Sequence, residues 1–60
     1  MITPAVAAEI VTTEHGSWML SQMGRDGLDD LLWDSCPEYQ RMPLDKRARF
    51  RDAVGEEIFG

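Results

Sequence analysis

The chain has 60 residues, of which 43% are hydrophobic and 28% are charged, and its formal net charge is −5. This length allows one small domain, residues 1–60, and the share of aliphatic and aromatic residues is typical of a folded protein and excludes a disordered one. The negative net charge disfavours nonspecific binding to nucleic acid or to anionic lipid.

The cysteine content and the apolar pattern exclude further classes of protein. A single cysteine, Cys36, excludes an intramolecular disulfide, and Cys36 and His15 are the only soft metal ligands, so we expect no metal and no cofactor. The chain has no run of eighteen apolar residues, and its N-terminus lacks the basic region of a secretory signal. We therefore expect a cytoplasmic protein that does not contact a membrane.

The first part of the chain predicts two helices separated by a glycine. The Thr-Pro pair at 3–4 is a helix-start signal and Gly16 is a stop signal, so a helix is predicted over about 4–14. Ser17 then caps a second, short helix that ends before the turn at 24–27.

The segment after this turn predicts an amphipathic helix over about 27–34. Asp26 can cap it, because a carboxylate accepts hydrogen bonds from the free N–H groups of the first turn. Three leucines fall within an arc of about 100°, since successive residues of a helix are about 100° apart. The leucines are Leu28, Leu31 and Leu32, and the aspartates on the opposite side are Asp26, Asp29, Asp30 and Asp34.

Prolines mark the start of each remaining element. Ser35 and Glu38 form a capping box, with Pro37 at the second helical position and a short turn after it. Pro43 opens a last helix over about 44–59. These signals predict an all-α fold, a small bundle of three to four short helices.

The expected core combines the apolar faces of the last two long helices. A chain of this size buries only about 60% of the surface that its unfolded form exposes, so we expect a homodimer to help complete the core. The predicted core residues are Leu28, Leu31, Leu32, Phe50, Val54 and Ile58.

The residues that could support catalysis form no recognisable motif. The candidate nucleophiles are Ser17, Ser21, Ser35 and Cys36, and His15 is the one near-neutral base. A short helical chain also has little volume for a water-poor cleft, so we predict no enzyme activity. We expect His15 at the C-terminal end of the first helix and Cys36 as a small buried hydrophobic residue.

The charges of the chain are separated along the sequence. Residues 1–40 carry seven acidic residues and one basic residue, whereas five of the six basic residues lie within 41–51. The 41–51 cluster supports the hypothesis of a small helical nucleic-acid-binding protein. On a helix, however, Lys46 and Arg49 project from one side and Arg47 and Arg51 from the other, so no single basic stripe forms. Direct binding of nucleic acid through the 41–51 cluster is therefore kept only as a second alternative function.

Arg47 and Arg51 project into the same half of their helix as the apolar residues. Arginines in such a position extend to solvent or bind acids. The natural acceptors recur every four residues along the aspartate-rich helix, and they are Asp26, Asp30 and Asp34. We predict a seam of arginines and aspartates, either within one chain or across a dimer.

Trp33 projects among the aspartates and away from the leucines. One interpretation is that the helix ends nearby and the indole folds back over the core. The other is that Trp33 anchors an interface together with Tyr39, because Trp, Tyr and Arg often dominate binding energy.

These patterns favour a small acidic, non-catalytic protein–protein interaction module that acts as an adaptor, an assembly component or an inhibitor of a larger protein machine. Its partner is another protein, or a second copy of the chain. The predicted partner-binding residues are Trp33, Asp26, Asp29, Asp30, Asp34, Tyr39, Arg47 and Arg51.

The alternative is mimicry of nucleic acid. A row of aspartates one helical turn apart presents regularly spaced negative charge, which can occupy the basic groove of a nucleic-acid-binding protein. Small acidic inhibitors made by phages, anti-CRISPR proteins among them, resemble this chain in size and in the sign of its charge. The resemblance implies a phage-type inhibitor that binds through its acidic face.

Overall fold

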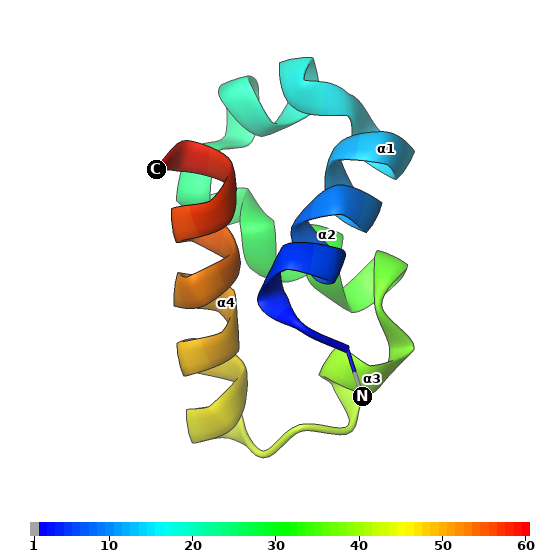
Figure 1. Cartoon of the computed structure of the whole chain (residues 1–60), viewed down its shortest axis with the longest axis vertical. Helices are drawn as coiled ribbons and strands as arrows, with labels where there is room; N and C mark the ends of the chain where they lie inside the picture. Colours follow the sequence, from blue (N-terminus) through cyan, green and yellow to red (C-terminus); the bar gives the residue numbers. More distant parts are fainter. Residues whose placement is uncertain (1) are drawn as a thin grey trace.

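The protein is all-α, as predicted (Figure 1). The computed structural model describes residues 2–60, except for the side chains of 15–19, 21, 23 and 25. The described chain forms four α-helices and a single 3₁₀ turn, without strands. The elements are α1 (Pro4–Met23), η1 (Gly24–Gly27), α2 (Leu28–Ser35), α3 (Pro37–Gln40) and α4 (Leu44–Phe59).

The two long helices, α1 and α4, lie side by side and run in the same direction (Figure 1). Helix α2 packs on both of them, and α3 follows it at the lower end of the molecule. The bundle measures 29 × 17 × 17 Å. Its accessible surface is 3967 Å², close to the value of about 3,950 Å² expected for a folded monomer of this mass. One copy is therefore as compact as an ordinary monomeric protein.

Helix α1 begins as the sequence predicts. The Thr3 side-chain oxygen accepts a hydrogen bond from the Val6 N–H at 3.2 Å, and Pro4 occupies the first helical position. Because the first N–H groups of a helix lack backbone acceptors, this bond satisfies one of them.

Removal of this cap gives a first testable expectation. Thr3→Ala should lower the free energy of unfolding by about 1 kcal/mol, because the Val6 N–H loses its side-chain acceptor. Urea unfolding followed by circular dichroism measures the loss. Thr3→Ser keeps the hydroxyl and should retain most of the stability. An alanine variant as stable as the serine variant would show that the cap contributes nothing.

The predicted stop at Gly16 is wrong, because α1 continues through this residue to Met23. The separate helix starting at Ser17 therefore does not exist as such. An interior glycine costs only about 1 kcal/mol relative to alanine, and the helix buries Val11 before it and Leu20 after it. The helix instead ends at Gly24, whose φ of 63° suits glycine and whose N–H donates to the Leu20 carbonyl.

Helix α2 has the predicted apolar side but a different start. Leu28, Leu31 and Leu32 are all buried, as expected. Asp26, however, lies within η1 and does not cap α2, which starts after Gly27 without a side-chain hydrogen bond. The prediction of an Asp26 cap is therefore wrong, because the glycine-flanked turn closes as a 3₁₀ helix one residue later than expected.

The start of α3 also differs from the prediction. Cys36, and not Ser35, precedes the helix, so Pro37 takes the favoured first position. Cys36 is 1% exposed, which confirms its prediction as a buried hydrophobic residue. Burial, and to a smaller extent the nearby Glu38 carboxylate, raises the pKa of its thiol. Helix α4 has the predicted bounds.

The core contains most of the residues predicted for it. Of the six, Leu28, Leu31, Leu32 and Val54 are buried, whereas Phe50 and Ile58 are partly buried and pack against them. Cys36, predicted separately to be buried, also belongs to the core. The buried side chains that were not predicted come from α1 and α3, and they are Ala7, Ala8, Val11, Leu20 and Tyr39.

Candidate functional site

The predicted partner-binding residues fall into two groups in the structure. One group joins α2, α3 and α4 through aromatic and charged contacts, and we call it the Trp33 cluster: Asp29, Trp33, Tyr39, Arg47 and Arg51. The other group comprises exposed carboxylates on the outer side of η1 and α2, and we call it the aspartate edge: Asp26, Asp30 and Asp34.

Tyr39 supports the cluster from inside and is not part of an accessible surface. Its side chain is 0% exposed, its ring lies 6.2 Å from that of Phe50, and its hydroxyl donates a hydrogen bond to Asp29 Oδ1. Burial, followed by the hydrogen bond and the charge of Asp29, raises the pKa of Tyr39 to about 12. The prediction that Tyr39 itself contacts a partner is therefore corrected: Tyr39 positions its neighbours.

Trp33 packs partly on the core and is partly exposed. The edge-to-face contact with Tyr39, at 6.5 Å and 88°, folds one side of the indole onto the core. The residue nevertheless remains 40% exposed. Its backbone carbonyl accepts a hydrogen bond from Gln40 Nε2 at 2.6 Å, and the Arg47 guanidinium carbon lies 5.3 Å from its ring centre. Trp33 is therefore held in place by its neighbours while part of its side chain stays exposed to solvent.

In place of the predicted arginine–aspartate seam, the described residues form one arginine–aspartate pair between α2 and α4, with a different acid. Arg51 Nη1 lies 3.5 Å from Asp29 Oδ1, and both side chains are partly exposed. Asp29 and Trp33 lie one turn apart on the flank of α2 that faces α4, so Asp29 can reach Arg51. The predicted acceptors project from other sides of the chain and do not face Arg51. The choice of Asp26, Asp30 and Asp34 as acceptors within one chain was therefore wrong.

Arg47 lacks a carboxylate among the residues that the structure describes. Its guanidinium lies over Trp33, and its Nε atom is buried without a hydrogen-bond partner. Such an atom is unusual, because buried polar atoms normally have partners. The aspartate edge is likewise without an ion pair to any side chain that the structure describes.

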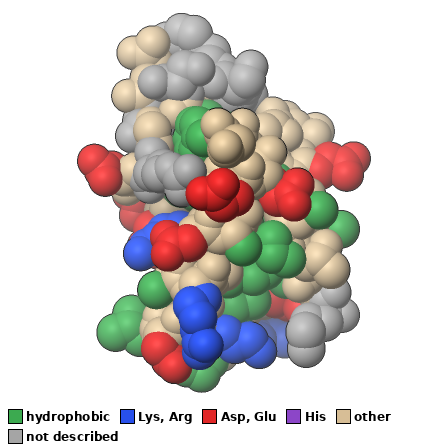
Figure 2. Space-filling model, turned by 60° about the vertical axis from the view of Figure 1, so that its left-hand side comes forward, with side chains coloured by type: hydrophobic (Ala, Val, Ile, Leu, Met, Phe, Trp, Pro, Cys, Tyr) green, Lys and Arg blue, Asp and Glu red, His purple; other side chains and the backbone are tan. Residues whose placement is uncertain are grey.

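The described basic residues of α4 differ in their exposure. On the face shown in Figure 2, basic side chains lie at the lower end of the molecule beside hydrophobic ones, and also at the left beside acidic ones. Arg49 pairs with Asp45 at 3.4 Å, where both side chains are almost fully exposed. Lys46 and Arg49 are exposed whereas Arg47 and Arg51 are partly buried, which confirms the predicted split of the basic cluster.

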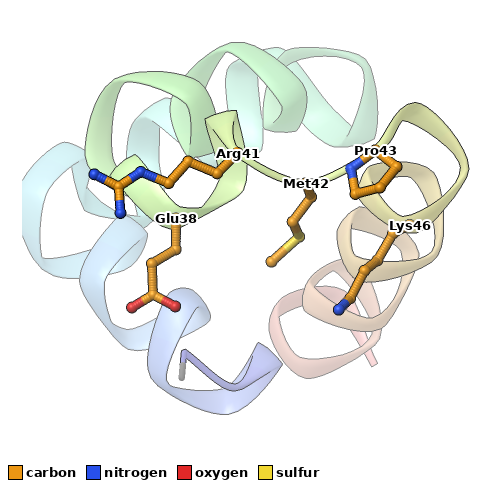
Figure 3. A pocket seen from close by; sticks show the side chains of 5 residues that line it. All are labelled: Glu38, Arg41, Met42, Pro43 and Lys46. Atoms are coloured by element: carbon orange, nitrogen blue, oxygen red, sulfur yellow. The ribbon is translucent and has the colours of Figure 1, made fainter.

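A shallow pocket lies where α3 meets the start of α4 (Figure 3). Its volume is about 340 Å³, and Met42 extends between Glu38 and Lys46. Glu38 Oε2 accepts a hydrogen bond from the Ile2 N–H at 3.0 Å, so this carboxylate ties the N-terminal segment to α3. The lining residues are Glu38, Arg41, Met42, Pro43 and Lys46, none of which carries a hydroxyl or a thiol.

Most of the residues considered for catalysis have side chains outside those that the structure describes. Cys36 is buried, and the side chains of His15, Ser17 and Ser21 lie outside those described. His15 does not end a helix, contrary to the prediction, because α1 continues past it. Within the described residues, no group of three or more His, Cys, Asp or Glu could hold a metal ion. No described helix is long and apolar enough to span a bilayer.

No protein-family model, curated protein or solved structure matches this chain. Sequence reasoning selected Trp33 and both arginines of the cluster, but it missed the contacts that join them. The Asp29–Arg51 ion pair and the Tyr39–Asp29 hydrogen bond depend on how α3 and α4 pack on α2, which local sequence patterns do not show.

Proposed function

We propose that the chain is a small non-catalytic protein–protein interaction module, an adaptor, assembly component or inhibitor, whose contact surface is centred on Trp33. The observation that carries this proposal is the state of Trp33: 40% exposed, yet fixed by Tyr39, Gln40 and Arg47. A large side chain that is already ordered loses little conformational entropy when a partner covers it.

The chemistry around Trp33 also supports this function. Tryptophan and arginine are the residues that most often dominate binding energy, and here they are stacked on one another at the surface. Catalysis has no such support, since the thiol of Cys36 is buried and its pKa is raised. As part of the proposal, the chain acts inside the cell, where a lone reduced cysteine is usual.

Replacement of Trp33 tests the proposal. Trp33→Ala should weaken binding of a partner by about 2 kcal/mol or more, roughly 30-fold, because it removes the anchor of the contact surface. Affinity capture from a lysate of the source organism identifies the partner, and calorimetry with the purified partner measures the change. Leu44→Ala is the matched control, because Leu44 is 75% exposed and lies at the start of α4.

The outcomes of this experiment separate function from folding. If circular dichroism shows equal helicity for the two variants, the weaker binding of Trp33→Ala is not caused by unfolding. If both variants bind the partner as the wild type does, Trp33 is not the anchor and the proposal is wrong.

Mimicry of nucleic acid is the second candidate, and the aspartate edge favours it. Asp26, Asp30 and Asp34 are all exposed; Asp30 and Asp34 lie one turn apart on α2, and Asp26 lies in η1 just before it. If they replace phosphates, binding should weaken steeply with salt and should compete with nucleic acid for the same target. Binding that is insensitive to salt but lost in Trp33→Ala would favour the anchored interface instead.

A further inference from the structure

The charges around Trp33 differ from one side of the residue to the other. On the side that faces α4 lies Arg47, stacked on the indole. On the side that faces away from α4 lie Asp30 and Asp34, because these positions follow Asp29 and Trp33 by about 100° around α2. The outer surface therefore has a basic flank, an aromatic centre and an acidic flank.

The charges on both flanks lack opposite charges within the described part of the chain. Arg47 has no carboxylate partner there, and its buried Nε has no acceptor. Asp30 and Asp34 are exposed and have no cation from another described side chain. By contrast, Arg51 and Asp29 on the same surface satisfy one another. Arg47 on one flank and Asp30 and Asp34 on the other are thus charged side chains without an ion-pair partner among the described residues.

We propose that a second copy of the chain covers this surface, related by a two-fold axis that runs along α2 past Trp33. Such an axis exchanges the two flanks, so Arg47 of each copy meets Asp30 and Asp34 of the other, with both indoles at the centre. An interface of this kind is self-complementary, as two-fold symmetry requires. The inference rests on the proposed function, because it names the occupant of the same surface.

The size of the chain is compatible with this dimer. A stable interface buries about 800 Å² on each partner, which is about one fifth of the 3967 Å² that this chain exposes. Exposed tryptophan at the centre with charged pairs around it is the usual composition of such an interface. The net charge of −5 on each copy opposes association, so the local contacts determine whether a dimer forms.

Charge exchange between the two flanks tests the proposal. The measurement is mass by light scattering and sedimentation over a range of concentrations, with untagged protein. The wild type should double its mass as concentration rises. Arg47→Glu alone and the double variant Asp30→Lys/Asp34→Lys alone should each stay monomeric, because like charges then face one another. An equimolar mixture of the two variants should form a one-to-one heterodimer, since both contacts are again opposite in sign.

Matched controls exclude a general effect of charge. Arg49→Glu changes the same helix by the same charge, and Asp45→Lys/Asp52→Lys matches the double variant on the outer side of α4; both should dimerise like the wild type. A monomeric wild type, a mixture of folded variants that stays monomeric, or single variants that still dimerise would overturn the proposal. If the wild type is monomeric but Trp33→Ala still loses a different protein partner, only the dimer is wrong and the proposed function stands.

Discussion

Replacing Tyr39 by alanine is expected to remove most of the stability of the fold. The side chain is 0% exposed and lies between the rings of Trp33 and Phe50. Truncating a buried aromatic side chain to alanine costs about 3–5 kcal/mol. The whole stability of a domain of this length is of the order of 3–9 kcal/mol. Urea unfolding monitored by circular dichroism should show the midpoint moving close to zero denaturant.

Two other variants show which part of Tyr39 matters. Tyr39→Phe keeps the ring, so it should lose only the hydrogen bond to Asp29, about 1 kcal/mol. Leu44→Ala truncates a residue that is 75% exposed and should change stability by less than about 0.5 kcal/mol. An alanine variant at Tyr39 that unfolds at the wild-type midpoint would contradict the central position of this ring in the core.

The elements that the sequence predicted best are those with strong local signals. The leucines of α2 are spaced so that only a helix places them together, and Pro43 sets φ where α4 begins. The extent of α1 could not be predicted in this way. A glycine at position 16 lowers helix propensity locally, but the burial of Val11 and Leu20 on either side outweighs that cost. This gain depends on α2 and α4, which a local pattern does not include.

The candidate site was predicted in its residues more than in its contacts. Projection onto a helix identified Trp33 and Arg47 as misplaced for an ordinary amphipathic pattern, and both proved to be in contact. The same projection could not say which flank of α2 faces α4, so Asp29 was not preferred over Asp30. Tyr39 lies in a four-residue helix, too short for periodicity to show. Its spacing of three residues from the buried Cys36 was the one available signal.

Raising the pH from about 10 to about 12 is expected to destabilise the protein through Tyr39. Burial first, and then the hydrogen bond and charge of Asp29, raise the pKa of Tyr39 from 10.0 to about 12 in the folded state. The unfolded chain loses this proton near pH 10, whereas the folded chain keeps it until about pH 12. The contribution of protonated Tyr39 to the free energy of unfolding is therefore complete below pH 10 and is lost as the pH rises to about 12. A shift of this size corresponds to about 2–3 kcal/mol.

Tyr39→Phe isolates this effect, because it has no proton to lose at this position. Near neutral pH the variant should be less stable than the wild type by about 1 kcal/mol, since Asp29 loses its donor. As the wild type loses stability between about pH 10 and about pH 12, the difference should shrink and then change sign. Urea unfolding of both proteins at a series of alkaline pH values measures this difference. The thiol of Cys36, whose pKa is also raised, is present in both proteins and cancels. A difference that stays constant with pH would mean that Tyr39 is not held protonated by its burial and by Asp29.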